Sequence, residues 1–142
     1  MSSALEEPRG ILKLSEAKSL SLLGSVPFGR VVFSRDALPA IRPVNHIVDG
    51  GTVIIRTHLG AAVLSAVGMV VAFEADSIDP VTRMGWSVIV IGVAKRIIDL
   101  DEAARFEDVL KPWVRESMDH VIRIVPEMVT GFELSAVPEP PG

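Results

Sequence analysis

The sequence contains no cysteine, so every type of site that depends on a thiol is missing. A chain without cysteine has no disulfide framework, no thiolate metal site and no cysteine nucleophile, and it fits a reducing compartment. The three histidines, His46, His58 and His120, lie in different segments without H-x-x-x-H or H-E-x-x-H spacing, so we predict no metal site. There is no G-x-G-x-x-G or Walker A sequence and no G-x-S-x-G nucleophile elbow. No residue reads as a general base or nucleophile.

Long apolar runs and excess positive charge are missing too. No uncharged apolar run approaches the ~18 residues of a membrane span, and the first residues lack the basic start and apolar stretch of a secretory signal. The formal net charge is -4, which gives no overall attraction to nucleic acid or to an anionic membrane. We therefore expect a soluble, cytoplasmic protein with neither of these partners.

What the sequence does have is apolar content, 49% of 142 residues, enough for one domain with a single core. We expect a flexible arm over residues 1–13, the folded domain over residues 14–134, and a Pro-rich disordered tail over residues 135–142.

Turn residues and β-branched residues divide the domain into short elements. Ser15 is a good helix N-cap and Gly24 a good stop, and Asp101 is placed to cap a second helix that runs to about Leu110. A third short helix is expected in the alanine-rich segment after Gly60. Strands are predicted over residues 28–34, 40–48, 52–57, 69–76 and 86–99, with two short strands within 120–134. Hairpin-length connections between strands predict a mainly β fold, with an antiparallel sheet closed into a barrel.

The segment 86–94 is apolar at both odd and even positions, which predicts a strand buried on both faces, in the centre of the sheet or in an interface. Gly92 within it indicates a bend or a close approach of another backbone. Because the apolar content exceeds what one small barrel easily buries, we expect a homodimer.

The stretch RPVNHIVDGGTVIIRTHLG, residues 42–60, reads as a hairpin that carries two arginines. With a two-residue turn, Pro43 would lie opposite Arg56 and the two arginines would point to opposite faces. With a three-residue turn, Val44 would lie opposite Arg56, and Arg42 would join Arg56 on one face. The sequence leaves both registers open, and also the simpler interpretation that both arginines are exposed rim residues.

Four segments in this order resemble the pyridoxamine 5′-phosphate oxidase-like, flavin-binding split-barrel family: LSEAKSLSLLGSVPFGRVVF, PAIRPVNHIVDGGTVIIRT, VVAFEADSID and GWSVIVIGVAKRI. The similarity runs from about Leu14 to Leu134. It implies a six-stranded Greek-key split β-barrel with a few short helices, and a homodimer with two cofactor sites in its interface. The implied ligand is FMN, a deazaflavin, or another flavin-like or tetrapyrrole-like molecule.

The resemblance also implies positions for the cofactor. Arg42, Val44 and Asn45 would lie along the ring and ribityl chain, and Ile55, Arg56 and Thr57 near the phosphate. Trp86 and Ser87 would border the cofactor or the dimer interface, although Trp86 alone would equally suit core packing. The sequence departs from the family at Ala61 and Ala62, where a basic residue usually holds the phosphate. Losing one charge-assisted hydrogen bond of ~1.5 to 3 kcal/mol would weaken binding roughly ten- to over a hundredfold.

Two functions therefore stay open. One is a flavin- or deazaflavin-dependent oxidoreductase acting on a small molecule, in which the cofactor performs the chemistry. The other is a dimeric split barrel that binds a ligand without catalysis; a purely structural dimer is a weaker third. Oxidation of pyridoxamine phosphate itself is disfavoured, because the basic residues for a phosphorylated substrate are missing. Glu74, Asp76 and Asp79 are interpreted as a solvated acidic cluster.

Overall fold

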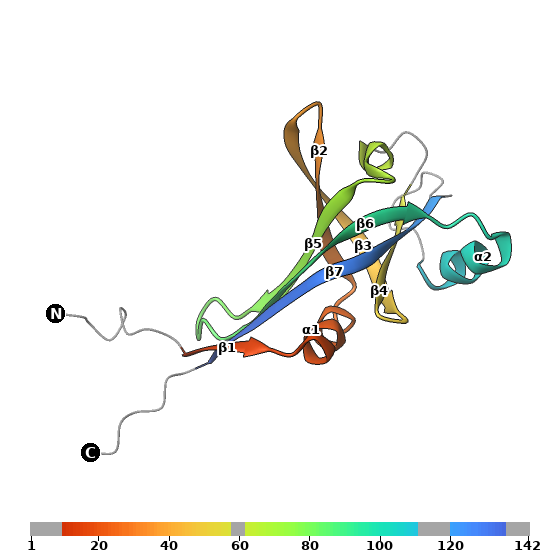
Figure 1. Cartoon of the computed structure of the whole chain (residues 1–142). Helices are drawn as coiled ribbons and strands as arrows, with labels where there is room; N and C mark the ends of the chain where they lie inside the picture. Colours follow the sequence, from red (N-terminus) through yellow and green to blue (C-terminus); the bar gives the residue numbers. More distant parts are fainter. Residues whose placement is uncertain (1–9, 58–61, 111–119, 136–142) are drawn as a thin grey trace, which may run out of the picture.

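The computed structural model describes residues 10–57, 62–110 and 120–135. Their strands form one antiparallel sheet (Figure 1). Its strands are β1 (Gly10–Leu14), β2 (Phe28–Arg35), β3 (Leu38–Asp49), β4 (Thr52–Thr57), β5 (Val70–Ile78), β6 (Gly85–Arg96) and β7 (His120–Ser135). Their order is β1-β7-β4-β3-β2-β5-β6, and β6 also pairs with β7. That last pairing closes strands β2 to β7 into a barrel. The predicted mainly β, antiparallel barrel is confirmed, with six strands around the barrel and β1 added at an edge.

Three short helical segments accompany the barrel: α1 (Glu16–Leu23), the 3-10 helix η2 (Ala62–Ala66) and α2 (Leu100–Val109). The predicted N-cap of α1 is confirmed, since the Ser15 hydroxyl accepts a hydrogen bond from the Lys18 N–H at 3.1 Å. The predicted cap of α2 is wrong by two residues. The side chain of Asp99, not Asp101, accepts the Glu102 N–H at 2.9 Å. No helix within the described ranges is long and apolar enough to cross a membrane.

Strand β1 corrects the expected flexible arm. Residues 10–13 pair with the end of β7, from Gly10 opposite Ser135 to Leu14 opposite Gly131. On one edge of β7, strand β4 pairs with the first residues of the strand and not with its end. Without β1, the end of this edge would expose unpaired N–H and C=O groups. Residues 1–9 and 136–142, the remainder of the expected arm and tail, lie outside the described residues.

Strand β7 is a single strand of 16 residues, so the prediction of two short strands there is wrong. It pairs with β6 along its length, and the register shifts between Ile91 and Gly92, where the partners pass from Met128 to Pro126. A bulge accommodates proline, which has no N–H to donate. At this place Gly92 is needed, because an added Cβ would clash with the Val125 carbonyl oxygen. The predicted close backbone approach at Gly92 is confirmed.

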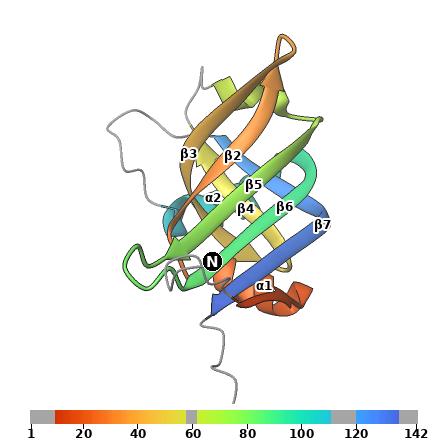
Figure 2. The same ribbon diagram turned by 90° about the vertical axis from the view of Figure 1, so that its left-hand side faces the viewer.

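Two clusters of buried side chains lie on opposite faces of β4. Val53 and Ile55 belong to the main core inside the barrel, whereas Ile54 belongs to a smaller cluster with Ile97, Phe106, Leu110 and Val121. The smaller cluster lies beneath α2, on the outside of the barrel. Figure 2 shows the crossed strands of the barrel, with α1 at one end of it.

The expectation that β6 is buried on both faces is wrong for the single chain. Val88, Val90 and Ala94 face the core, whereas Ile89, on the other face, is 42% exposed. Alternation along a strand sends successive side chains to opposite faces. Strand β6 therefore has a buried apolar face and a partly open apolar face.

Candidate functional site

The turn between β3 and β4 sets how the predicted site residues are arranged. Asp49 pairs with Thr52, which leaves Gly50 and Gly51 as a two-residue turn. Both glycines have positive φ, 57° and 75°, as a tight hairpin turn of the I′ type requires. The register runs on to His46 opposite Ile55. Both predicted pairings, Pro43 or Val44 opposite Arg56, are therefore wrong.

Arg42 and Arg56 point to opposite faces, as expected for a two-residue turn. Arg42 is exposed, and its Nη1 donates to the carbonyl of Ile41 at 2.9 Å. The Nη1 of Arg56 donates to the carbonyls of Glu107 and Leu110, both at 2.8 Å. These carbonyls belong to the C-terminal end of α2. The predicted contact of Arg56 with a phosphate stays a prediction, while its observed partners are backbone carbonyls.

The other predicted site residues are divided between the same two faces. Val44 and Ile55 are part of the barrel core. Thr57, 4% exposed, pairs with His120 at the end of β4. Asn45 is also buried, but it follows Val44 along β3 and therefore faces outward, on the side of α2. The hairpin thus contributes to two surfaces.

Trp86 and Ser87 do not share a face. Trp86 packs against the barrel core, as the simpler interpretation held. Ser87 lies on the opposite face of β6, between its cross-strand partners Asp76 and Phe132. Ala62 is the first residue of η2 and packs partly against the core. Ala61 and His58 lie outside the described residues.

A cavity of about 450 Å³ lies on the outer side of β3. Three segments line it: the α1–β2 connection (Gly24, Ser25, Val26, Pro27, Phe28), β3 (Asn45, His46, Ile47) and the end of α2 (Val109, Leu110). Its volume is in the range of small-molecule sites, and its walls combine apolar residues with polar ones such as Ser25, Asn45 and His46. Of the predicted site residues only Asn45 lines it. Sequence reasoning missed the other nine, because nothing local indicates that these segments meet.

His46 fixes one edge of this cavity. Its Nε2 lies 2.7 Å from the Leu23 carbonyl oxygen, and because a carbonyl only accepts, Nε2 carries the proton. The ring packs edge-on against Phe73 with 4.7 Å between centroids. Burial lowers the pKa of His46, although its hydrogen bond to Leu23 acts in the opposite direction. A neutral imidazole therefore holds the end of α1 against β3.

A second polar group lies on the outside of β2 and β5. Arg30 Nη1 is 3.1 Å from Glu74 Oε1 and 4.0 Å from Asp76 Oδ2. Burial, then the hydrogen bond and negative charge of Asp76, raise the pKa of Glu74 to about 7, against the lowering effect of Arg30. Asp79 is separate, since its carboxylate accepts the N–H groups of Val81 and Thr82 at 2.7 and 2.9 Å. The three residues of the predicted acidic cluster thus divide into two carboxyls that are paired with Arg30 and one, Asp79, that accepts hydrogen bonds in a turn.

Comparison with known proteins adds four findings. The sequence profile of the pyridoxamine 5′-phosphate oxidase family matches residues 15–133. The uncharacterized protein Rv0080 of Mycobacterium tuberculosis is 49% identical over 137 residues, which cover 92% of this chain and 90% of that protein. Among solved structures, the FAD binding protein from Mycobacterium smegmatis is 36% identical with a TM-score of 0.74, over 87% of this chain and 99% of that one. A conserved protein of unknown function from Corynebacterium diphtheriae is 33% identical with a TM-score of 0.70, over 87% and 98%.

Proposed function

This chain belongs to the pyridoxamine 5′-phosphate oxidase family, and from that premise we propose that it binds a flavin nucleotide and acts as a flavin-dependent oxidoreductase on a small molecule. The observation that carries the proposal is the cavity on the outer side of β3, which contains Asn45, one of the residues that the family resemblance implies. A similar solved protein, 36% identical and covered almost entirely, is described as an FAD binding protein.

The cavity suits the ring system of a flavin. Phe28, Val109 and Leu110 offer apolar surface to a flat aromatic ring, and Asn45 offers an amide to its polar edge. The two-residue turn supports this assignment, because it places Asn45 on the side of α2 and Val44 in the core. We assign the ring to this cavity and no contact of it to Trp86, which packs on the opposite side of the sheet.

The phosphate end of the ligand bears on which flavin is bound. Ala61 and Ala62 supply no positive charge where relatives of this type usually have a basic residue. FMN ends in a phosphate monoester with a charge near -2, whereas the diphosphate of FAD spreads a similar charge over two linked groups. A weak clamp penalises the concentrated charge more. We therefore rank FAD ahead of FMN, with a deazaflavin as the third candidate.

A bound flavin supplies hydride or electron transfer, and the chain has to hold it, orient it and exclude water from it. The described lining of the cavity fits that division, since it contains no carboxylate, lysine or arginine side chain. The same observation favours the second candidate, a protein that binds the ligand without catalysis. Turnover with a reduced nicotinamide or deazaflavin donor separates the two.

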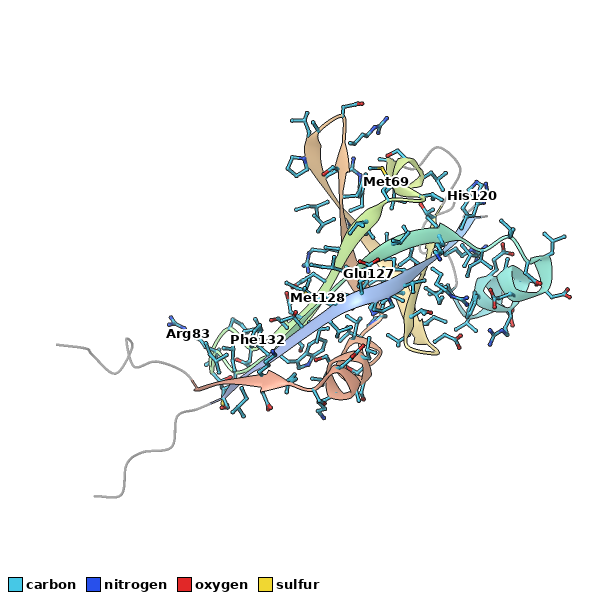
Figure 3. The ribbon with its side chains drawn as sticks, in the orientation of Figure 1. Met69, Arg83, His120, Glu127, Met128 and Phe132 are labelled. Atoms are coloured by element: carbon cyan, nitrogen blue, oxygen red, sulfur yellow. The ribbon has the colours of Figure 1, made fainter. Side chains whose placement is uncertain are left out.

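We also propose that the active form is a homodimer, formed through the outer face of β5, β6 and β7. Exposed apolar residues lie there, namely Val70 on β5 and Ile89 on β6. Met128 and Phe132, which Figure 3 labels, lie along β7. The strand registers place them on neighbouring rows of one sheet face. Exposed apolar residues on one sheet face are typical of an interface, here bordered by the ion-paired Glu74 opposite Ile89, and a symmetric pair is the commonest assembly.

Titration of the purified chain with FAD, FMN and a deazaflavin, followed by ligand absorbance and tryptophan fluorescence, tests the binding. The matched variants are Val109→Glu at the cavity wall and Val81→Glu in a distant loop, since these valines are 58% and 86% exposed and neither is core. We expect Val109→Glu to weaken flavin binding at least tenfold, because it adds bulk and negative charge beside an anionic ligand, and Val81→Glu to leave it unchanged. If both variants retain the same saturable binding, the assignment of the flavin ring to this cavity is wrong. The absence of binding up to millimolar ligand would refute the flavin proposal.

A further inference from the structure

Among the residues that the structure describes, the last turn of α2 carries no positive charge that would compensate its end of the helix dipole. The first turn carries Asp101 and Glu102, which suit the positive end of the helix dipole, but the last turn contains no basic residue. The last carbonyls of a helix have no intrahelical donor and carry partial negative charge. Here the missing donor comes from a distant strand, since Arg56 of β4 donates to the carbonyls of Glu107 and Leu110.

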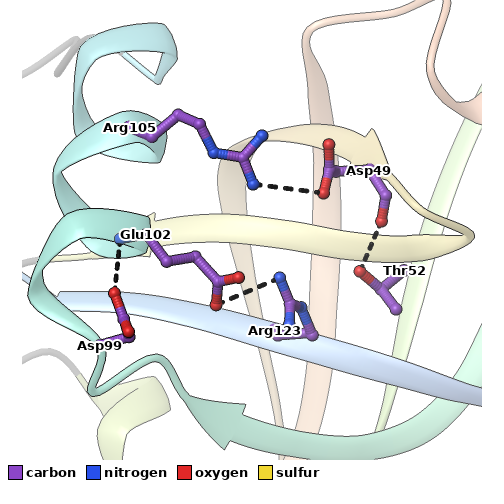
Figure 4. Close-up of polar contacts among 6 residues, drawn as sticks. All are labelled: Asp49, Thr52, Asp99, Glu102, Arg105 and Arg123. Atoms are coloured by element: carbon purple, nitrogen blue, oxygen red, sulfur yellow. Dashed lines mark hydrogen bonds and ion pairs between the residues drawn. The ribbon is translucent and has the colours of Figure 1, made fainter.

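The rest of α2 is attached at other points (Figure 4). Arg105 lies 3.8 Å from Asp49 at the β3–β4 turn, and Glu102 lies 3.4 Å from Arg123 on β7. Both guanidiniums also lie over the ring of the buried Phe106, at 4.5 and 5.8 Å from its centroid. These contacts hold the start and middle of the helix. The two ion pairs are made by residues that precede the last turn, and exposed ion pairs such as that of Arg105 contribute little.

The last turn is the part of α2 that borders the cavity. Val109 and Leu110 line it, and Leu110 is buried in the cluster with Ile54 and Val121. The carbonyl of Leu110 is one of the two that Arg56 holds. The guanidinium of Arg56 thus hydrogen-bonds directly to Leu110, a residue of the cavity wall.

We propose that Arg56 is a positioning residue: it holds the last turn of α2 so that Val109 and Leu110 form a fixed wall of the cavity. Docking of α2 and binding of a ligand in the cavity are then coupled, because a ligand that needs the wall favours the docked helix and a loosened helix lowers the affinity. The identity of that ligand rests on the function proposed above. The positioning itself is a property of the ligand-free chain.

This role differs from direct contact with the ligand's phosphate. A guanidinium that binds phosphate acts through its charge, so its loss lowers the salt dependence of ligand binding and leaves the exchange of the ligand-free helix unchanged. A guanidinium whose Nη1 donates to two backbone carbonyls, as that of Arg56 does, acts through these hydrogen bonds. Its loss then loosens the helix whether or not a ligand is present, and leaves the salt dependence unchanged.

Hydrogen exchange of the ligand-free protein tests the positioning directly. We expect the amides of residues 106–110 to exchange roughly tenfold or more faster in Arg56→Ala, which corresponds to the loss of about one charge-assisted hydrogen bond. Arg56→Lys should recover part of the protection, because an ammonium still donates to a carbonyl. The control is Arg35→Ala, an exposed arginine at the end of β2, which should not change exchange in α2. Equal exchange in the wild type and in Arg56→Ala would overturn the inference.

Titration of the same variants with FAD at several salt concentrations tests the coupling. We expect Arg56→Ala to weaken binding with an unchanged salt slope, in step with the faster exchange of α2. Weaker binding with a reduced salt slope and unchanged exchange would make Arg56 a direct ligand and overturn the inference, as would full affinity despite a loosened α2. If Arg56→Ala does not fold, exchange and affinity in Arg56→Lys decide in the same way. If the wild type binds no flavin, the proposed function fails, while the exchange experiment still decides the role of Arg56.

Discussion

The raised pKa of Glu74 leads us to expect that the stability of this protein falls as the pH rises towards 8. Its pKa is raised from 4.5 to about 7 in the folded chain, mainly by burial and then by Asp76. Between these two values the folded state binds more protons than the unfolded state. The free energy of unfolding therefore decreases with pH across this window and levels off above it.

The size of the effect follows from the two pKa values. Complete transfer of this difference into stability would amount to about 3 kcal/mol. The side chain is 26% exposed and Arg30 partly offsets its charge, so solvent screening reduces the figure, and we expect about 1 to 2 kcal/mol. Glu74→Gln imitates the protonated carboxyl. The variant should match the wild type at pH 5 and exceed it by that amount at pH 8.5.

Urea unfolding at both pH values, followed by circular dichroism, measures the difference. The control is Asp79→Asn, which should be less stable than the wild type by the same amount at pH 5 and at pH 8.5, because both values lie above the ordinary pKa of 3.8. Hydrogen bonds from Thr82 and Val81 lower the pKa of Asp79, so its contribution is present above the unfolded pKa and is lost as the pH falls through the folded one. A difference between Glu74→Gln and the wild type that does not change between pH 5 and pH 8.5 would refute the reasoning.

Two further predictions follow from the sheet. Gly92→Ala should destabilise the fold by about 2 kcal/mol or more in urea unfolding, because the new Cβ meets the Val125 backbone. Gly50→Ala should cost only about 1 kcal/mol, because a Cβ there meets no other atom and only the positive φ is unfavourable. Equal costs of the two variants would contradict the bulge argument. Ile89→Lys should turn the proposed dimer into a monomer in sedimentation velocity without loss of fold, since Ile89 is 42% exposed in the single chain. A wild type that sediments as a monomer at micromolar concentration would refute the dimer proposal.

The parts of the fold that depend on neighbours in sequence were predictable. The cap at Ser15, a tight turn within residues 49–51 and the β-branched strands follow from local chemistry, whereas the length of that turn stayed open. Strand β1 was not predictable, because residues 10–13 are ordered by an edge of β7 more than a hundred residues away along the chain. The continuity of β7 was hidden for a similar reason. Pro126 reads as a break in sequence, and only its position at the bulge opposite Gly92 makes it compatible with a strand.

The candidate site shows the same division. The sequence indicates that the β3–β4 hairpin carries unusual polar residues, and the family resemblance places Asn45 near the cofactor together with Arg42, Arg56 and Thr57. It does not indicate that the α1–β2 connection and the end of α2 complete a cavity around Asn45, because these three segments meet only through tertiary packing. The two arginines show the limit most clearly, since their residue type is the same and their surroundings differ.

That difference follows from the alternation of β4 and its turn. With Gly50 and Gly51 as the turn, odd-numbered residues of β4 enter the barrel core, and even-numbered residues face α2. Arg56 is even-numbered, so it meets the end of α2, whose carbonyls accept its hydrogen bonds. A turn longer by one residue would shift the register of β3 against β4 and move Asn45 to the other face of its strand relative to Arg56. The two-glycine turn therefore determines that the buried amide and the end of α2 lie on the same side of the sheet, where the cavity is.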